Sequence, residues 1–301
     1  MKKKRIICFV LLVCVLAAAF HLLHPRSLGI AYRVSGGQNE MIILGSIHVG
    51  SKAMYPMNRE LQSAIRNADI LVFECDTDSE EARRLTQEMM FYPDLDALSN
   101  HISPETRRQL SLASQKVGLN DGLFESMKPW AVTSMLSLQD TSTQMGGATT
   151  ELGVESVVKK LAKGKLKLYL ETVEEQLGMM DAFSPALQDY LLQTACETII
   201  EEKGEEDLSS WPLWWVDGNA DAFAKSYLKS QENEKEPALA QEYHNSLITL
   251  RNQKMAKKLA DLLETGNDKQ YFVTIGLMHL VLPDDSVLRE LENMGYQVEA
   301  I

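Results

Sequence analysis

Two short apolar segments, one near each end of the chain, finish in the same pattern of a glycine followed three residues later by a histidine. The first covers residues 41–48 and contains Gly45 and His48. The second covers residues 271–279 and contains Gly276 and His279. Short apolar runs bounded by glycine are typical of buried β-strands. Because packing alone does not require the same ending twice, we interpret the two segments as halves of one site.

The residues after the first of these strands predict a parallel β-α-β unit. Residues 58–68 have apolar side chains on one face, as an amphipathic helix does, and the apolar run 70–73 predicts a strand that ends at Glu74. A strand, a helix and a strand in this order and over this length are typical of a right-handed parallel unit. A further strand is predicted at 166–170, where Glu171 follows.

Helical patterns fill most of the remaining chain. They dominate residues 79–164 and 173–265, and a last strand is predicted at 296–301. With 301 residues, the chain is long enough for one large domain or for a domain with a sizeable insertion. We therefore predict an α/β fold over residues 25–301, with a mostly parallel β-sheet, flanking helices and a large helical insertion at 79–164 and 173–265.

Residues 1–24 differ from the rest of the chain. Basic residues at 2–5 precede an uninterrupted apolar run at 6–20. A basic flank with an apolar core is typical of an export signal, and the alanines at 17–19 offer a cleavage site. The run also approaches the length that spans a bilayer, so an uncleaved membrane anchor is the other interpretation. Either one predicts that the main domain lies outside the cytoplasm.

The charge of the chain argues against nucleic acid as a partner. It has 42 acidic residues against 30 Lys and Arg, for a net charge of −12, and the sequence has no basic patch of the kind that phosphate binding needs.

Outside residues 1–24 the chain has two cysteines, Cys75 and Cys196. In an exported domain they could form a disulfide, but two cysteines make no disulfide framework. Two buried thiols are the favoured interpretation, because free cysteine behaves as a small apolar side chain.

Polar side chains follow four of the predicted strands at the point where each one ends. They are His48, Glu74, Glu171 and His279. In open α/β sheets ligands bind outside the carboxyl ends of the strands, so these side chains could converge on one site. Two imidazoles and two carboxylates would suit a divalent Zn, Mn, Fe or Co ion, which could activate water for hydrolysis. Taken singly, each histidine could instead be a strand cap or a core residue, and each glutamate could simply face solvent.

An arginine interrupts the apolar face of the helix predicted at about 243–264. Arg251 falls in the stripe that Ile248 and Met255 define. A buried arginine needs an anionic partner. That partner is either a carboxylate of the protein, in a structural salt bridge, or a substrate carboxylate or oxyanion. Asn252 stands beside it in the sequence and could hydrogen-bond the same group.

Together these residues resemble the TraB/GumN family, whose relatives include the Tiki metalloproteases and, more remotely, the erythromycin-esterase and ChaN-like proteins. The resemblance covers about residues 30–301. It rests on Leu44-Gly-Ser-Ile-His-Val-Gly50 with Tyr55-Pro56, Phe73-Glu74-Cys-Asp76, Lys128-Pro-Trp130, Leu170-Glu-Thr-Val-Glu-Glu-Gln-Leu177, Arg251-Asn-x-x-Met255, and Gly276-Leu-Met-His-Leu280 with Gly295-Tyr296. One departure is Gly153-Val-Glu155, where the family usually has an aspartate as the third residue. Glu171 lies in a family motif and could serve either the site or its structural support.

The resemblance implies a metal-dependent hydrolase, which in Tiki proteins is a peptidase acting outside the cell. By position it implies that His48, His279 and Glu74 are essential, holding the metal or activating its water. Arg251 matches the family's arginine and, with Asn252, would orient the substrate.

We therefore expect an exported or membrane-anchored metallohydrolase, foremost a peptidase. The expected cofactor is a divalent Mn, Co or Zn ion. The expected partners are a peptide or small-molecule substrate and a membrane reached through residues 1–24. The alternative is a non-enzymatic protein that holds a peptide or, as ChaN-like relatives do, haem in the same cleft.

Overall fold

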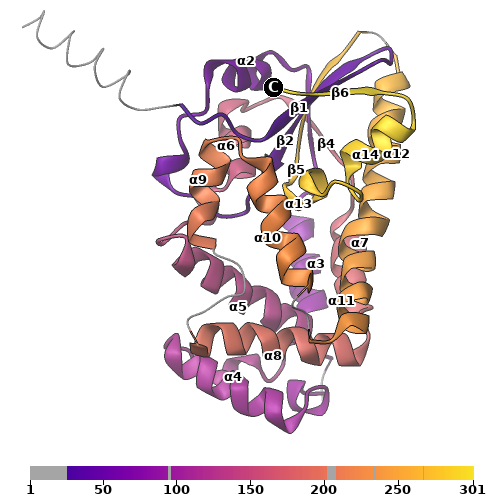
Figure 1. Ribbon diagram of the computed structural model, residues 1–301. Coiled ribbons are helices and arrows are strands. Elements are labelled where there is room, and N and C mark those ends of the chain that lie inside the picture. The colour runs from indigo at the N-terminus through magenta and orange to yellow at the C-terminus, as the bar shows by residue number, and fades with distance from the viewer. Residues whose placement is uncertain (1–25, 94–95, 202–207, 233–234, 267) are drawn as a thin grey trace, which may run out of the picture.

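Six strands form one mixed β-sheet in the computed structural model, which describes residues 26–301 except 94–95, 202–207, 233–234 and 267 (Figure 1). The strands are β1 (Ala31–Ser35), β2 (Glu40–Ser46), β3 (Ile70–Phe73), β4 (Leu166–Tyr169), β5 (Gln270–Gly276) and β6 (Gln297–Ala300). Their order across the sheet is β4-β3-β5-β2-β1-β6. The export signal or anchor expected at 1–24 lies outside the described residues.

The strands that carry the predicted site run parallel. β4 pairs with β3, β3 with β5, and β5 with β2, all in parallel. At the other edge, β1 is antiparallel to both β2 and β6. The predicted α/β fold is confirmed, with a mixed sheet. β1 was not predicted, because Tyr32 and Arg33 are only partly buried and leave the strand without a strong apolar pattern.

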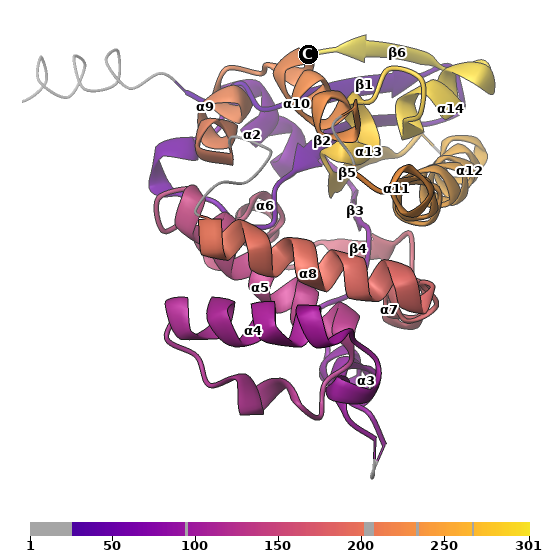
Figure 2. The ribbon, with the colours of Figure 1, turned by 60° about the horizontal axis from the view of Figure 1, so that its bottom comes forward.

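The central strands are apolar on both faces because helices cover both sides of the sheet. α2 (Arg59–Asn67) and α6 (Val154–Leu161) pack against each other and against β5, while α12 (Leu250–Glu264) packs against α14 (Val287–Asn293). Figures 1 and 2 show these two pairs on opposite sides of the sheet. β5 is accordingly buried from Tyr271 to Ile275.

A second hydrophobic cluster lies apart from the sheet, among the helices that connect β3 to β4 and β4 to β5. It is built by α3 (Glu80–Met90), α4 (Pro104–Lys116), α5 (Pro129–Gln144) and α8 (Pro185–Glu201), and it includes Leu110, Trp130 and Leu192. Figure 1 shows α4, α5 and α8 together below the sheet. The other helices are α7 (Val173–Asp181), α9 (Trp211–Val216), α10 (Ala220–Glu232), α11 (Pro237–His244) and α13 (Met278–Val281), and a π-helical segment (Asn245–Thr249) joins α11 to α12.

The Lys128-Pro-Trp130 motif ties the start of α5 to the end of α7. Pro129 occupies the first turn of α5, where its missing N–H costs no hydrogen bond. Lys128 Nζ lies 2.8 and 2.7 Å from the carboxylate oxygens of Asp181, and Trp130 Nε1 donates to the same carboxylate at 2.9 Å. The motif therefore orients α5 relative to α7.

Cys75 and Cys196 are both buried and free, as the favoured interpretation predicts. Burial raises the pKa of each thiol to about 12, so both stay protonated at neutral pH.

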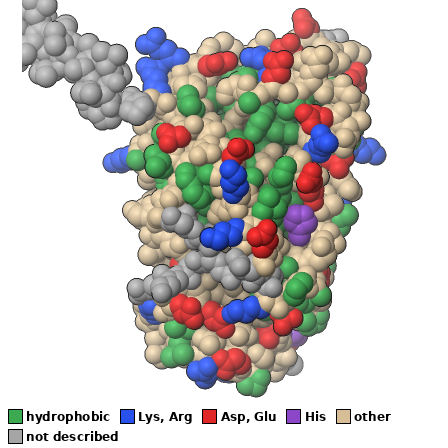
Figure 3. All heavy atoms as spheres, viewed as in Figure 1, with side chains coloured by type: hydrophobic (Ala, Val, Ile, Leu, Met, Phe, Trp, Pro, Cys, Tyr) green, Lys and Arg blue, Asp and Glu red, His purple; other side chains and the backbone are tan. Residues whose placement is uncertain are grey.

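Within the described part of the chain, no helix has both the length and the apolar composition needed to cross a bilayer. On the face that Figure 3 shows, acidic and basic side chains are intermixed.

Candidate functional site

Four parallel strands have their carboxyl ends on the same side of the sheet. β4, β3, β5 and β2 lie next to one another, so the residues that follow them lie along that side. Glu171 follows β4, Glu74 follows β3, His279 lies in α13 after β5, and His48 follows β2. The first three are buried, with exposed fractions of 6%, 7% and 5%, whereas His48 is exposed. The structure thus gathers three of the four residues into one buried cluster and leaves the fourth facing solvent.

Arg251 holds the three buried side chains together. Its Nε donates to both oxygens of Glu171 at 3.0 Å, and its Nη2 donates to Oε2 of Glu171 at 2.5 Å. Nη2 also donates to Oε2 of Glu74 at 2.7 Å, and Nη1 donates to Nε2 of His279 at 2.9 Å. Burial would lower the pKa of Arg251, but Glu171 and Glu74 outweigh it and raise the pKa. Of the two partners expected for this arginine, the structure shows carboxylates of the protein itself.

Glu74 accepts hydrogen bonds from three separate elements. Its Oε1 accepts from the backbone N–H of Gly276, and its Oε2 accepts from Arg251 and, at 3.4 Å, from Nε2 of Gln176. Gly276 is needed for this approach, since a Cβ there would lie 2.9 Å from Oε1. Burial alone would raise the pKa of Glu74, but Arg251 and further neighbours outweigh it and lower the pKa to about 2. The carboxylate is therefore ionised throughout the physiological range.

The hydrogen bonds of Asn252 fix the protonation of His279. Nδ2 of Asn252 donates to the backbone oxygen and to Oδ1 of Asp285, both at 2.9 Å. Oδ1 of Asn252 therefore faces Nδ1 of His279 at 2.7 Å, and because an amide oxygen only accepts, Nδ1 carries the proton. Nε2 is then free to accept from Arg251. Burial lowers the pKa of His279 to about 4 despite the charge of Glu74, so the imidazole is neutral at pH 7.

Asp285 is the residue of this network that the sequence did not reveal. Besides Asn252, its carboxylate accepts from the hydroxyl of Thr249, and its Oδ2 lies 3.0 Å from Nε2 of His244. Burial would raise the pKa of Asp285, but these hydrogen bonds outweigh it and lower the pKa. No motif marks Asp285 or His244 in the sequence, and their partners lie in other segments of the chain.

Replacing Asp285 by asparagine should lower the free energy of unfolding by about 1–3 kcal/mol at pH 7, because an amide cannot accept from all three donors and leaves one of them unsatisfied. The folded-state pKa of Asp285 is depressed, so its contribution is present above the unfolded pKa of about 3.9 and is lost as the pH falls below it. Urea unfolding at pH 7 and pH 3.5 checks this, with the exposed neighbour Asp284→Asn as the control. Equal stability of the two variants at pH 7 would refute the role given to Asp285.

The loop that carries His48 is held by backbone contacts. Gly50 and Thr149 exchange two backbone hydrogen bonds, at 3.0 and 2.9 Å. Gly153 packs directly on the loop, since a Cβ there would lie 2.2 Å from the backbone oxygen of His48. The backbone of His48 is therefore fixed while its imidazole reaches solvent. The charge of that imidazole acts on both Glu74 and His279.

The donors expected to hold a divalent metal ion engage Arg251 in this arrangement. Nε2 of His279 and Oε2 of Glu74 both accept from its guanidinium. Two carboxylates against one guanidinium leave an excess negative charge that favours a further cation, but the one lone pair that Nε2 of His279 could give such an ion is already used by Arg251. Among the described residues, no group of three His, Cys, Asp or Glu side chains is placed to hold an ion. As arranged, these residues do not fit a metal ion, and a metal site would require Arg251 to release His279.

A cavity of about 210 Å³ opens beside the cluster. Glu171 and Arg251 contribute to its wall, together with Met179 of α7, Ser246 of the π-helical segment and Lys254 of α12. Two members of the buried cluster are therefore accessible from a space between α7 and α12.

Comparison with known proteins places the whole domain in one group. The profile of the TraB/PrgY/gumN family matches residues 30–300. The chain belongs to the TraB/PrgY/gumN family. The resemblance drawn from the sequence motifs is thereby confirmed. The matched region includes all the strands and the strand-end cluster, a name used here for His48, Glu74, Glu171, Arg251 and His279.

Curated relatives of this TraB/PrgY/gumN protein include the uncharacterized protein YbaP of Escherichia coli (strain K12) and that of Shigella flexneri. Each is 30% identical over 146 residues, which is 48% of this chain and 53% of YbaP. The chain thus spans about half the length of these relatives. No solved structure matches it.

Proposed function

We propose that this TraB/PrgY/gumN protein is a hydrolase that acts on a peptide or a related small carbonyl compound at the strand-end cluster. The observation that carries the proposal is the contrast between exposed and buried side chains at the carboxyl ends of the parallel strands. An exposed imidazole, His48, stands near a buried group of charged and hydrogen-bonded side chains whose pKa values are strongly shifted. Strongly shifted pKa values gather at functional sites, and parallel sheets bind ligands at this edge.

His48 acts as the general base in this scheme. Its imidazole takes a proton from a water molecule while the water oxygen bonds to the substrate carbonyl carbon. The same proton then passes to the leaving amine or alcohol as the bond from that group to carbon breaks. The ionised carboxylate of Glu74, whose charge interacts with that of His48, stabilises the imidazolium that forms between the two steps.

Arg251, Asn252 and His279 are positioning residues in this scheme. Arg251 keeps Glu74 ionised and in place, and His279 accepts from Arg251 while Asn252 fixes its tautomer. Glu171 binds the other side of the guanidinium and so supports the same arrangement. The Mn, Co or Zn ion expected from the sequence stays a separate proposal, supported by the donor types and not by their present arrangement.

A library of peptides and carboxylic esters tests the proposal. The full chain is incubated with the library in EDTA and, separately, with Mn²⁺, Co²⁺ and Zn²⁺, and products are identified by mass spectrometry, with a mock purification as the control. We expect cleavage of at least one compound. Cleavage in EDTA would show that the protein residues suffice, and cleavage with a metal alone would show that Arg251 gives way to an ion. No cleavage in any condition by folded protein would contradict the hydrolase.

The alternative, haem or peptide binding without catalysis, has less support. Both ring nitrogens of His279 are engaged, which leaves His48 as the one histidine of the cluster that an axial haem bond could use directly. A Soret band that appears on adding haem and weakens in His48→Ala, without hydrolysis of the library, would favour this alternative.

We also propose that residues 1–24 direct the domain out of the cytoplasm, on the strength of their basic flank and apolar run. Protease added to cells with a permeabilised outer envelope should digest the domain, and full protection would contradict the proposal.

A further inference from the structure

A second and larger cavity, of about 370 Å³, lies between α5 and α8, two of the helices that build the second hydrophobic cluster. The end of α7 and the residues around the π-helical segment, including Phe183, Tyr243 and Leu247, close its other sides. Its volume is within the range of small-molecule sites in proteins. It shares no lining residue with the cavity beside Arg251.

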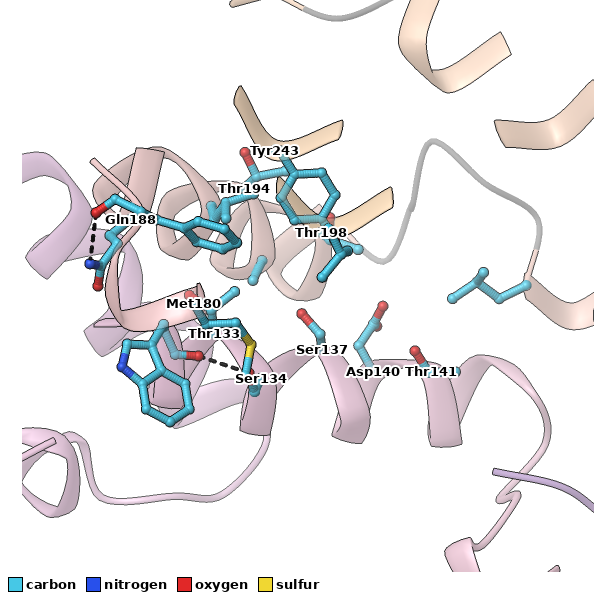
Figure 4. A pocket seen from close by; sticks show the side chains of 16 residues that line it. Thr133, Ser134, Ser137, Asp140, Thr141, Met180, Gln188, Thr194, Thr198 and Tyr243 are labelled. Carbon is cyan, nitrogen blue, oxygen red and sulfur yellow. Dashed lines mark hydrogen bonds between the residues drawn. The ribbon is translucent and has the colours of Figure 1, made fainter. Parts of the chain in front are cut away.

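The two long helices line this cavity with hydroxyl groups. Those from α5 are Thr133, Ser134, Ser137 and Thr141, and those from α8 are Thr194 and Thr198. Thr133 and Ser134 donate to backbone oxygens one turn earlier in α5, so these two hydroxyls keep only acceptor capacity. Figure 4 shows Ser137 and Asp140 pointing from α5 into the space below Thr198 and Tyr243.

Asp140 sets the charge of the cavity. Among the described residues that line it, Asp140 is the one with a formal charge at pH 7. Its carboxylate is partly buried and accepts from Nε2 of Gln144 at 2.6 Å. Burial raises the pKa of Asp140, against the effect of the Gln144 hydrogen bond. No cation among the described residues pairs with this carboxylate, and supplying one is favourable.

The rest of the lining is apolar or aromatic. It includes Phe183, Leu247 and Met180, and Trp130 from the start of α5. A ligand here needs an apolar body that covers these side chains and a head that donates hydrogen bonds to a carboxylate and to hydroxyl oxygens.

We propose that this cavity binds an organic ammonium ion with an aryl or alkyl body. The ammonium group donates to the carboxylate of Asp140 and to the hydroxyl oxygen of Ser137, which point into the same space. The body lies against the apolar lining, which includes Phe183 and Leu247. Anionic ligands are disfavoured by Asp140, and an ammonium has donors alone, which matches the Asp140 carboxylate and the hydroxyl oxygens of Thr133 and Ser134, whose protons are already donated. The proposal does not rest on the hydrolase, because binding is measured without turnover.

Calorimetric titration of the full chain with benzylamine and with benzyl alcohol tests this. The two probes share a body and differ in the charge of the head. Wild-type protein should bind benzylamine at least about tenfold more tightly, as expected for a hydrogen bond between charged groups. Asp140→Asn should lose that preference while benzyl alcohol binding stays unchanged. Asp121→Asn, an exposed carboxylate outside the cavity, is the matched control and should bind as wild type does.

Equal affinity of wild-type protein for the two probes, or no binding of benzylamine up to millimolar concentration, would overturn the proposal without any variant. Wild-type benzylamine affinity in a folded Asp140→Asn protein would overturn it as well, since the ammonium would then bind elsewhere. The melting temperature of each variant shows whether it is folded.

Discussion

Replacing Arg251 by methionine should lower the free energy of unfolding by about 3–5 kcal/mol at pH 7. Methionine fills a similar volume but leaves Glu74 and Glu171 buried without their cation, and it leaves Nε2 of His279 without a donor. The arginine side chain is 9% exposed, so solvent screens these interactions little. Urea unfolding of the wild-type and variant proteins measures the difference.

The loss caused by Arg251→Met should shrink as the pH falls. In the wild-type protein the folded-state pKa of Glu74 is lowered to about 2, so its ionised form stabilises the fold above the unfolded pKa of about 4.3 and loses that effect as the pH falls towards 2. Without Arg251, burial dominates and the folded-state pKa of Glu74 rises. Protonation then relieves the variant at acid pH while it removes stability from the wild type, so the difference between the two proteins should shrink as the pH falls and be smallest as the pH approaches 2.

Two further variants separate charge from geometry. Arg251→Lys keeps a positive charge but cannot bridge both carboxylates and His279 with one planar group, so an intermediate loss is expected. Arg84→Met removes an arginine from the exposed pair with Glu88 and should cost less than about 1 kcal/mol. A loss for Arg251→Met no larger than that for Arg84→Met would show that the cluster is not held by the arginine.

The fold was predictable because the central strands have strong local patterns. β2 and β5 are apolar on both faces and have a glycine as the penultimate or last residue, and their apolar faces match their burial between two layers of helices. β1 lacks such a pattern, since it lies between β2 and β6 with three partly exposed residues. Its pairing with β2 depends on the turn at Gly36, where φ is 109°, and a glycine in a polar connector does not by itself indicate a hairpin.

The proximity of the buried strand-end residues was predictable, but their hydrogen bonds were not. The sequence placed Glu74, Glu171 and His279 at strand ends, and it indicated that Arg251 is buried with an anion. It could not show that one guanidinium contacts all three, because those contacts join segments far apart in the chain. Asn252 was expected to hydrogen-bond the same group as Arg251.

The structure instead places the Asn252 amide between Asp285 and His279. Asn252 and Arg251 thus share one partner, His279, and bond opposite nitrogens of its ring, because adjacent residues on a helix point in different directions.

His48→Ala should reduce the rate of hydrolysis by about 10²- to 10⁴-fold, the contribution expected of a general base. The same change should alter the free energy of unfolding by less than about 0.5 kcal/mol, because the imidazole is exposed and its loop is held by backbone contacts. Lys52→Ala, an exposed change in the short helix that follows the loop, is the matched control and should leave both quantities unchanged.

The most direct test of the strand-end cluster as a hydrolytic site is kcat/KM of wild type, His48→Ala and Lys52→Ala on a substrate found in the library. The melting temperature of each protein is measured first, and equal values show that all three are folded. We predict that wild type and Lys52→Ala are equal and that His48→Ala falls at least about a hundredfold below them. Undiminished kcat/KM in a stably folded His48→Ala protein would show that the chemistry takes place elsewhere.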